Sequence, residues 1–524
     1  MRYTLLILVI VCFTSYANAQ TNLLFSNLPV GKYEIGFNIV TVTDSSRVTR
    51  PLNNYFGEKE TGDRFRKIIM HIWYLAKINT GKGKMSFADY CYSGDLSSLN
   101  ENIKEADKNK MIVQTRAGLE HFFGKADNKN WSEIIQTKML ASKAGEPLNG
   151  KFPLLLGMLR PLSTTVTNEL LASNGYVVAM VVSNGGRWPA GFISDINDMQ
   201  KAIAYLSRTF MVDPDFIGTF GFSGSGFSQL LLAMNDPRIA AYADIESALY
   251  GEGVAEVLSS SDYYNTDKLH VPFLHIYGKE LAKSDVKFDD FLKTKYSSRY
   301  HLALNYPRLH HWDVAAEGRL STTLVHMRGN DEPGIKASFE ICNIYLLQFF
   351  NSELKHLIES KKFLADRSLL KGYADSLWTI NHYDALRQPP DRKQFGEFIG
   401  RKGIQEGLQL ARTFQKLDSN TAFIHENDLN MLAQEFEEKN KPIEAIELMK
   451  LATEFHPYKA WLWNNLAGIE EDNGKKEEAI HDSEKVLEIL KDVKGEPSSF
   501  DGRVRKNSKD RLERLIPGYK ANKF

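Results

Sequence analysis

Short apolar runs alternate with helical segments through the middle of the chain. The apolar runs predict buried strands, and the segments between them carry apolar residues at helical spacing. Expected strands cover 152–159, 175–182, 216–222, 239–245, 271–277 and 300–305, and expected helices cover 166–173, 193–210 and 337–354. This alternation predicts an α/β fold with a doubly wound, mostly parallel sheet.

Other elements are expected on both sides of this block. Strands rich in β-branched and aromatic residues are predicted at 31–43 and 65–74. The more polar stretch 85–145 is expected to be helical, with helices at 100–109 and 111–123 over an active-site face. Beyond about residue 360 the strand pattern stops, and the rest of the chain is expected to be helical.

A repeat of 34 residues marks the helical region. Leu432-Ala433 recurs as Leu466-Ala467, and Ala445-Ile446 recurs as Ala479-Ile480. The period resembles two tetratricopeptide repeats, which are helix pairs that bury their apolar positions by stacking. The expected parts of the chain are a signal peptide at 1–19, an α/β domain at 20–360, a helical linker or degenerate repeat at 361–425, two repeats at 426–495 and a polar tail at 496–524.

The first residues have the organisation of a secretory signal peptide. Arg2 precedes the apolar run Leu5–Phe13, and Ala17-Asn18-Ala19 offers a cleavage site with two small residues. The run is too short to span a membrane. We therefore expect cleavage near Ala19, export to the periplasm or the medium, and a mature chain without a transmembrane segment.

Charge and cysteine content narrow the classes of function. The chain has 65 Lys and Arg against 65 Asp and Glu, and loss of Arg2 with residues 1–19 leaves 64 against 65. This balance offers no electrostatic basis for binding nucleic acid. Cys91 and Cys342 would remain, but two cysteines so far apart in sequence do not predict a disulfide. The Cys and His spacing does not match a zinc site, so no metal and no cofactor is expected.

The run Phe216–Phe222 leads into a bend at Ser223 and then into an apolar helix. A serine exposed on such a strand–turn–helix bend needs small residues two positions before and after it, because larger side chains would collide. Gly221 meets this need on one side of Ser223, and the small Ser225 stands on the other. Ser225 itself would have Phe227 two positions later, so Ser223 is the predicted nucleophile.

A serine hydroxyl becomes a nucleophile when a base takes its proton and an acid orients that base. The base is expected after the last strand of the sheet, where His310 and His311 stand side by side. The acid is expected at the carboxyl end of a strand, where such sheets place their ligands. This position favours Glu246 over Asp244, which alternation places on the same face, and Glu280 after the next strand is the alternative.

Two backbone N–H groups would have to stabilise an oxyanion beside Ser223. Gly224, directly after the serine, is expected to supply one of them. Leu159, in the loop after the strand 152–159, is expected to supply the other. Any residue other than proline can act as such a donor.

Several segments together resemble the dienelactone-hydrolase and platelet-activating-factor-acetylhydrolase-like branch of the α/β-hydrolases. The resemblance covers about residues 28–355 and is carried by the bend at Ser223 and by Gly31–Phe37, Ile72–Tyr74, Phe152–Leu156, Leu171–Val178 and Leu309–Asp313. It implies Ser223 as nucleophile, His311 rather than His310 as base, and Glu246 where the branch has aspartate. The chain departs from the branch by having Ser225 for glycine and Leu159-Arg160 where many esterases have His-Gly.

Two functions are expected from these residues. The first is an exported serine esterase that hydrolyses a short-chain or acetyl ester, or a lactone, through an acyl-enzyme on Ser223. The alternative is a catalytically inactive scaffold of the same fold that binds proteins through its helical repeats. In either case the repeats offer a surface for a protein partner or for self-association.

Overall fold

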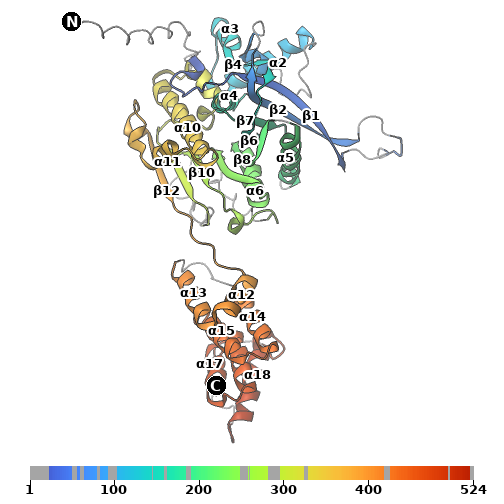
Figure 1. Ribbon diagram of the computed structural model, residues 1–524, viewed down its shortest axis with the longest axis vertical. Helices are drawn as coiled ribbons and strands as arrows, with labels where there is room; N and C mark the ends of the chain where they lie inside the picture. The colour runs from blue at the N-terminus through green and yellow to red at the C-terminus, as the bar shows by residue number, and fades with distance from the viewer. Residues whose placement is uncertain are drawn as a thin grey trace, which may run out of the picture. The chain divides into compact units, whose positions relative to one another are not determined.

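The computed structural model describes most of the chain, and the expected signal peptide at 1–19 lies outside the described residues. These are residues 23–49, 53, 56–59, 64–78, 83–91, 103–143, 145–158, 162–183, 190–209, 211–247, 258, 260–280, 296–323, 328–417, 425–493 and 496–519. The chain divides into two compact units, Met1–Ala385 and Leu386–Phe524 (Figure 1).

A mixed sheet forms the centre of the first unit. Its described strands are β1 (Ile35–Val48), β2 (Phe65–Lys77), β3 (Lys84–Ser86), β4 (Lys138–Lys143), β5 (Glu146–Pro147), β6 (Phe152–Met158), β7 (Val177–Val181), β8 (Val212–Phe222), β9 (Ile239–Ile245), β10 (Phe273–Gly278), β11 (Arg299–Leu304) and β12 (Trp378–Tyr383). They lie in the order β12-β11-β10-β9-β8-β6-β7-β2-β1-β4-β3, with β5 beside β2. The neighbours from β11 to β7 are all parallel, so the predicted α/β class with a parallel central block is confirmed.

Helices cover both faces of this sheet. The described helices of the first unit are α1 (Phe87–Cys91), α2 (Glu105–Phe123), α3 (Asn128–Gln136), α4 (Thr165–Ser173), α5 (Ala190–Thr209), α6 (Ser225–Asn235), α9 (Ala316–Thr323), α10 (Glu332–Glu353) and α11 (Ile358–Ala365), with short 3-10 turns η1 (Leu23–Phe25), η2 (Thr266–Lys268), η3 (His311–Val314), η4 (Gly329–Asp331), η5 (Arg367–Leu369) and η6 (Asp375–Leu377). Apolar residues of α4 and α10 pack on one face, and those of α5 and α6 pack on the other. The sheet is therefore doubly wound.

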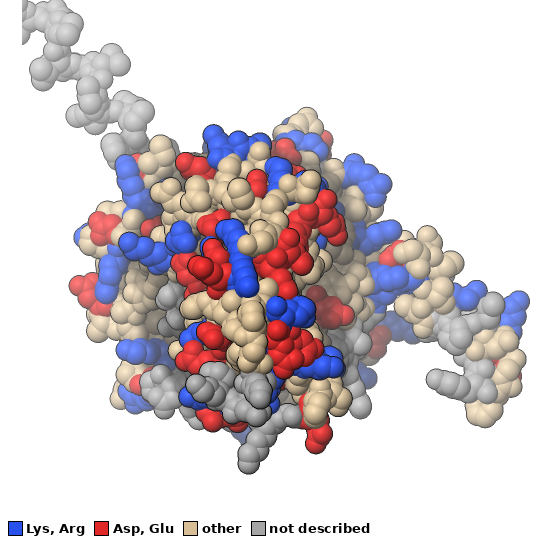
Figure 2. All heavy atoms as spheres, turned by 90° about the horizontal axis from the view of Figure 1, so that it is seen from below, with Lys and Arg blue, Asp and Glu red and all other residues tan. Residues whose placement is uncertain are grey.

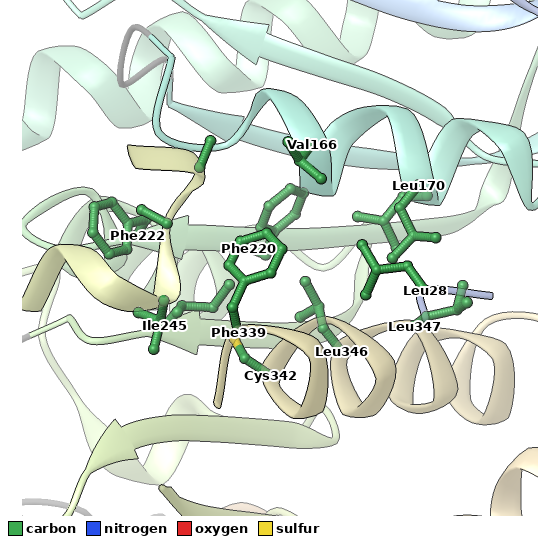
Figure 3. Packing of buried hydrophobic residues seen from close by; sticks show 14 of the residues in the cluster. Leu28, Val166, Leu170, Phe220, Phe222, Ile245, Phe339, Cys342, Leu346 and Leu347 are labelled. Atoms are coloured by element: carbon green, nitrogen blue, oxygen red, sulfur yellow. The ribbon is translucent and has the colours of Figure 1, made fainter. Parts of the chain in front are cut away.

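The core beneath the bend at Ser223 comes from β8 and its neighbours. Phe220 and Phe222 of β8 point to the same side, as alternate residues of a strand do. Figure 3 shows Phe220 between α4, which contributes Val166, and α10, which contributes Phe339. These buried side chains hold the carboxyl end of β8, where the bend begins.

Two parts of the first unit differ from the sequence prediction. The stretch 85–145, expected to be helical, contains the six-residue strand β4, which pairs in parallel with β1, and one helix, α2, replaces the two expected helices. The sheet also continues past the expected boundary at residue 360, because β12 pairs antiparallel with β11. Both strands have six residues and lack a long apolar run, and β12 is largely exposed. The pattern of apolar residues therefore did not indicate them.

The second unit is helical in its described residues. Its helices are α12 (Arg392–Lys402), α13 (Ile404–Leu417), α14 (Glu426–Glu438), α15 (Pro442–Phe455), α16 (Ala460–Asp472), α17 (Lys476–Ile489) and α18 (Phe500–Leu515). The starts of α14 and α16 lie 34 residues apart, as do those of α15 and α17. Asn440 and Gly474, also 34 apart, have positive φ in the turns between paired helices. The stretch 496–524, expected to be a polar tail, contains α18, which buries Val504 and Leu512.

The cysteines, the apolar character of the helices and the surface charge bear on the expectations about disulfides, membrane spans and nucleic acid. Cys91 and Cys342 are both free thiols. Among the helices that the structure describes, none has the length and apolar character needed to cross a membrane. On the face shown in Figure 2, acidic and basic side chains are interspersed, in line with the balanced charge of the sequence.

The burial of Trp378 predicts that β12 contributes to the stability of the first unit. Trp378 is fully buried, its Nε1 donates to Tyr345 Oη at 3.0 Å, and the Arg367 guanidinium lies 4.8 Å from its ring. We expect Trp378→Ala to lower the free energy of unfolding by about 3–5 kcal/mol. The exposed neighbour gives a control, since Thr379→Ala should cost less than about 1 kcal/mol. Urea unfolding followed by circular dichroism would contradict a structural role for β12 if both substitutions had the same effect.

Candidate active site

Ser223 occupies a sharp turn between β8 and α6. Its φ is 56°, in the left-handed region that residues other than glycine seldom adopt. Hydrogen bonds from Ser223 N to Ile245 O (3.0 Å) and from Gly226 N to Ser223 O (2.9 Å) hold the turn. A Cβ at Gly221 would come within 2.7 Å of the Gly226 backbone. The small residue expected at position 221 is thus required by the close approach of strand and helix.

Ser225 fits the position where glycine was expected by binding the backbone of the same turn. Its Oγ donates to Phe222 O at 2.6 Å and accepts from Phe222 N at 3.0 Å. The side chain is buried, and its proton is engaged by the carbonyl. The departure from glycine is therefore accommodated locally, and of the two serines Ser223 is the one that is only partly buried.

His311 lies at the start of η3, in the loop after β11. Its Nε2 is 2.9 Å from Ser223 Oγ. The Phe222 ring stacks on the imidazole with centroids 5.0 Å apart and an interplanar angle of 22°, and the Trp312 ring meets it edge-on at 5.2 Å. The side chain remains 30% exposed. The two aromatic rings therefore limit the rotation of the imidazole while one part of it stays open to a ligand.

His310, the alternative base, is exposed and takes part in the structure of the turn. Its backbone N–H donates to Asp313 Oδ2 at 2.6 Å. Asp313 is buried and forms an ion pair with Arg328, with 2.5 Å between Oδ1 and Nη1. This ion pair holds η3 in position. In this position of the turn, His311 and not His310 faces Ser223.

Glu246 follows the last residue of β9 and is fully buried. Its Oε2 lies 3.3 Å from His311 Nδ1, and its Oε1 accepts a hydrogen bond from Gly278 N at the end of β10. Its own N–H donates to Ile276 O at 2.8 Å. The structure therefore brings Ser223, His311 and Glu246 into one hydrogen-bonded row of hydroxyl, imidazole and carboxylate.

The other candidate carboxylates lie elsewhere. Glu246 has a φ of 48°, so the chain turns at this residue and the strand alternation that would group it with Asp244 ends. Asp244 is buried, accepts from Ser247 Oγ at 2.6 Å and pairs with His275 Nδ1. Glu280 is exposed in the turn after β10. Of the three, Glu246 is the carboxylate within hydrogen-bond reach of His311.

Of the two residues expected to donate a backbone N–H to the oxyanion, the structure describes Gly224 but not Leu159. Gly224 follows Ser223 as the N-cap of α6, and N–H groups at the start of a helix have no acceptor within it. Leu159 lies outside the described residues. The strand before it, β6, pairs in parallel with β8, so the chain leaves β6 at the same edge of the sheet as Ser223. It is described again from Leu162, which has a φ of 72°.

Glu317, a carboxylate that the sequence did not indicate, lies near this row. It is the second residue of α9 and accepts a hydrogen bond from Ser163 Oγ at 2.6 Å. Burial raises the pKa of Glu317 to about 7, against smaller lowering effects of the Ser163 hydrogen bond and the His311 charge. An acidic residue in the first turn of a helix is ordinary, because it interacts well with the helix dipole. No pattern in the sequence distinguished Glu317 from that case.

Two aromatic residues extend from His311 toward the inserted helix α2. Phe122, near the end of α2, is 52% exposed, and its ring lies 5.1 Å from that of Trp312. Trp312 in turn lies 5.6 Å from Phe222. The end of α2 therefore contacts the turn that carries His311. Among the described residues, no group of three or more His, Cys, Asp or Glu is placed to hold a metal ion.

Comparisons with known proteins give a distant resemblance only. No family model matches the chain, and no curated protein matches it. Among solved structures, it is similar to a ferulic acid esterase from Streptomyces cinnamoneus with a TM-score of 0.45 and 14% sequence identity, over 68% of this chain and 98% of that chain. A likeness this distant carries no argument about activity or substrate. The function of the site is therefore inferred from its own geometry.

Proposed function

We propose that this protein is a serine hydrolase of the α/β-hydrolase type that cleaves a carboxylic ester through an acyl-enzyme on Ser223. The observation that carries the proposal is the row in which His311 Nε2 lies 2.9 Å from Ser223 Oγ and His311 Nδ1 lies 3.3 Å from Glu246. These are the contacts by which a base and an orienting acid activate a serine. The left-handed φ of Ser223 supports the same role, because a serine nucleophile at a strand-to-helix turn sits in such a strained backbone conformation.

The reaction follows from the contacts of each residue. Ser223 Oγ attacks the ester carbonyl while His311 Nε2 takes the hydroxyl proton. The negative charge that develops on the carbonyl oxygen is stabilised by the N–H of Gly224, with the loop after β6 as the source of a second donor. The tetrahedral intermediate collapses, the alcohol leaves with the proton from His311, and the acyl group stays on Ser223. Water, activated by His311, then releases the acid and restores the serine.

The carboxylate of Glu246 stabilises the imidazolium in each half of this cycle. It is buried, so its attraction to a charged imidazole is screened less than it would be in water. The hydrogen bond from Gly278 N holds one oxygen in place while the other faces His311 Nδ1. The carboxylate thereby also selects the tautomer in which Nε2 is free to accept a proton from Ser223.

The substrate class, location and partners belong to the same proposal. The sequence resemblance to the dienelactone-hydrolase and platelet-activating-factor-acetylhydrolase-like branch supports a short-chain or acetyl ester, or a lactone. The organisation of residues 1–19 supports export of the protein. The 34-residue helix pairs of the second unit support a tetratricopeptide-like surface for a protein partner or a second copy.

Covalent labelling tests the proposal directly. A fluorophosphonate should add to the wild-type protein in a 1:1 ratio, detected by intact mass, and Ser223→Ala should abolish the adduct. Ser225→Gly is the matched control, since it changes a serine of the same turn whose Oγ bonds to the Phe222 backbone, and it should still be labelled. A folded wild-type protein without an adduct would contradict the proposal and favour the inactive scaffold.

The choice of acid makes a separate prediction about rates. Glu246→Gln should lower kcat for p-nitrophenyl acetate by about 10²- to 10⁴-fold, because the neutral amide neither stabilises the imidazolium nor enforces its tautomer. Glu280→Gln, an identical change at an exposed residue, should stay within about twofold of the wild type. Equal losses of kcat in the two variants, or a larger loss in Glu280→Gln, would show that Glu246 is not the acid that orients His311.

A further inference from the structure

We propose that Phe122 and Trp312 bind the alcohol part of the ester, and that this part carries an aromatic ring. These two side chains, which we call the aromatic surface, determine which leaving alcohols the site accepts. The inference rests on the proposed function, since it names the substrate class of the same site. Neither residue takes part in the proton transfers, so both are specificity-determining residues.

The aromatic surface continues a row of rings that begins at the proposed base. The centroid of the Trp312 ring lies 5.2 Å from that of the His311 imidazole and 5.1 Å from that of the Phe122 ring. Trp312 is partly buried, and Phe122 is 52% exposed. A single exposed apolar side chain is ordinary on a protein surface. Phe122 differs from that case because its ring is connected through Trp312 to the imidazole.

A second contact holds the end of α2 against η3. Phe123, the last residue of α2, is buried, and the Arg328 guanidinium lies 5.8 Å from the centroid of its ring. Arg328 in turn pairs with Asp313 of η3. The end of the helix is thus joined to the turn of the base both through Phe122 and through Phe123. The aromatic surface is therefore formed without a ligand, which lowers the entropic cost of binding one.

The aromatic surface lies beside the group that gives a proton to the leaving alcohol. In the proposed reaction the alcohol oxygen takes its proton from His311 Nε2, so it must come within hydrogen-bond reach of that atom. The acyl carbon is instead bonded to Ser223 Oγ. A group attached to the alcohol oxygen therefore begins next to the imidazole. Of the two rings that contact the imidazole, Phe222 is buried and Trp312 is only partly buried, so Trp312 is the one with surface for a ligand.

The shape and charge of the aromatic surface favour a neutral aromatic group. The rings of Phe122 and Trp312 are inclined at 43°, so a third ring can stack on one and meet the other at an angle. Such a ring also buries more apolar area than a short alkyl chain does. The Arg328 guanidinium nearby is engaged by Asp313 and offers no charge to the substrate. The surface therefore fits an acetyl or other short-chain ester of an aromatic alcohol.

The test compares benzyl acetate with ethyl acetate, two esters of the same acid whose alcohols are similar in basicity. The wild-type kcat/KM should be about tenfold higher for benzyl acetate, because its ring reaches the aromatic surface. Phe122→Ala should lower kcat/KM for benzyl acetate roughly threefold to tenfold, through KM and with kcat within about twofold, because the lost contact exists before and during the reaction. The same variant should leave ethyl acetate within about twofold, and Phe122→Tyr, which keeps the ring, should restore the preference.

Val113→Ala is the matched control, because Val113 lies on the same helix, is 65% exposed and is likewise apolar. It should hydrolyse both esters as the wild type does. Ethyl phenylacetate carries the ring on the acid, and Phe122→Ala should change its kcat/KM by less than about twofold. Equal losses for benzyl acetate and ethyl phenylacetate would overturn the assignment to the alcohol part. If circular dichroism shows that Phe122→Ala does not fold, Phe122→Leu, which also removes the ring, decides the outcome by the same ratio.

Fluorophosphonate labelling separates this inference from the proposed function. Phe122→Ala should still be labelled in a 1:1 ratio, because Ser223, His311 and Glu246 are unchanged. A wild-type protein that is not labelled would defeat both proposals. A labelled wild type that hydrolyses benzyl acetate no better than ethyl acetate, or whose preference survives in Phe122→Ala, would defeat the aromatic surface alone and leave the serine hydrolase intact.

Discussion

The Glu246 carboxylate lies in the interior of the first unit, at the point where β9 ends. A buried carboxylate is costly unless hydrogen bonds replace its hydration, and here His311 and the backbone of Gly278 contribute to that replacement. The contact with His311 requires η3 to reach across the edge of the sheet. The hydrogen bond from Gly278 requires β10 to lie beside β9. The position of Glu246 therefore depends on, and helps to maintain, the arrangement of two strands and the turn that carries the base.

The parallel block explains how residues so distant in sequence meet. The strands β6, β8, β9 and β10 run in the same direction, so their carboxyl ends lie along one edge. That edge carries the end of β6 at Met158, the bend at Ser223, Glu246 and Gly278. The apolar residues of α4 and α10 support it from one face. Each chemical group of the site thus sits at the end of an element whose direction is set by buried packing.

Local rules predicted the parts of this arrangement that depend on neighbours in sequence. The need for a small residue at Gly221 and the exclusion of Ser225 follow from sterics within one turn, and they point to Ser223. Periodicity could not separate Glu246 from Asp244, because the distinguishing feature is a left-handed residue at the strand end. The strands β4 and β12 were missed since they are short and gain stability from pairing, and the raised pKa of Glu317 was missed since it comes from tertiary burial.

The central claim is that the row of Ser223, His311 and Glu246 forms an acyl-enzyme. Stopped-flow mixing of the full chain with excess p-nitrophenyl acetate tests it most directly, because the alcohol leaves before the acyl group does. The account predicts a burst of p-nitrophenol approaching one equivalent per chain, together with an acetyl group on the Ser223 peptide after an acid quench. Release of p-nitrophenol with the acetyl group on another residue, or at the uncatalysed rate, would contradict it.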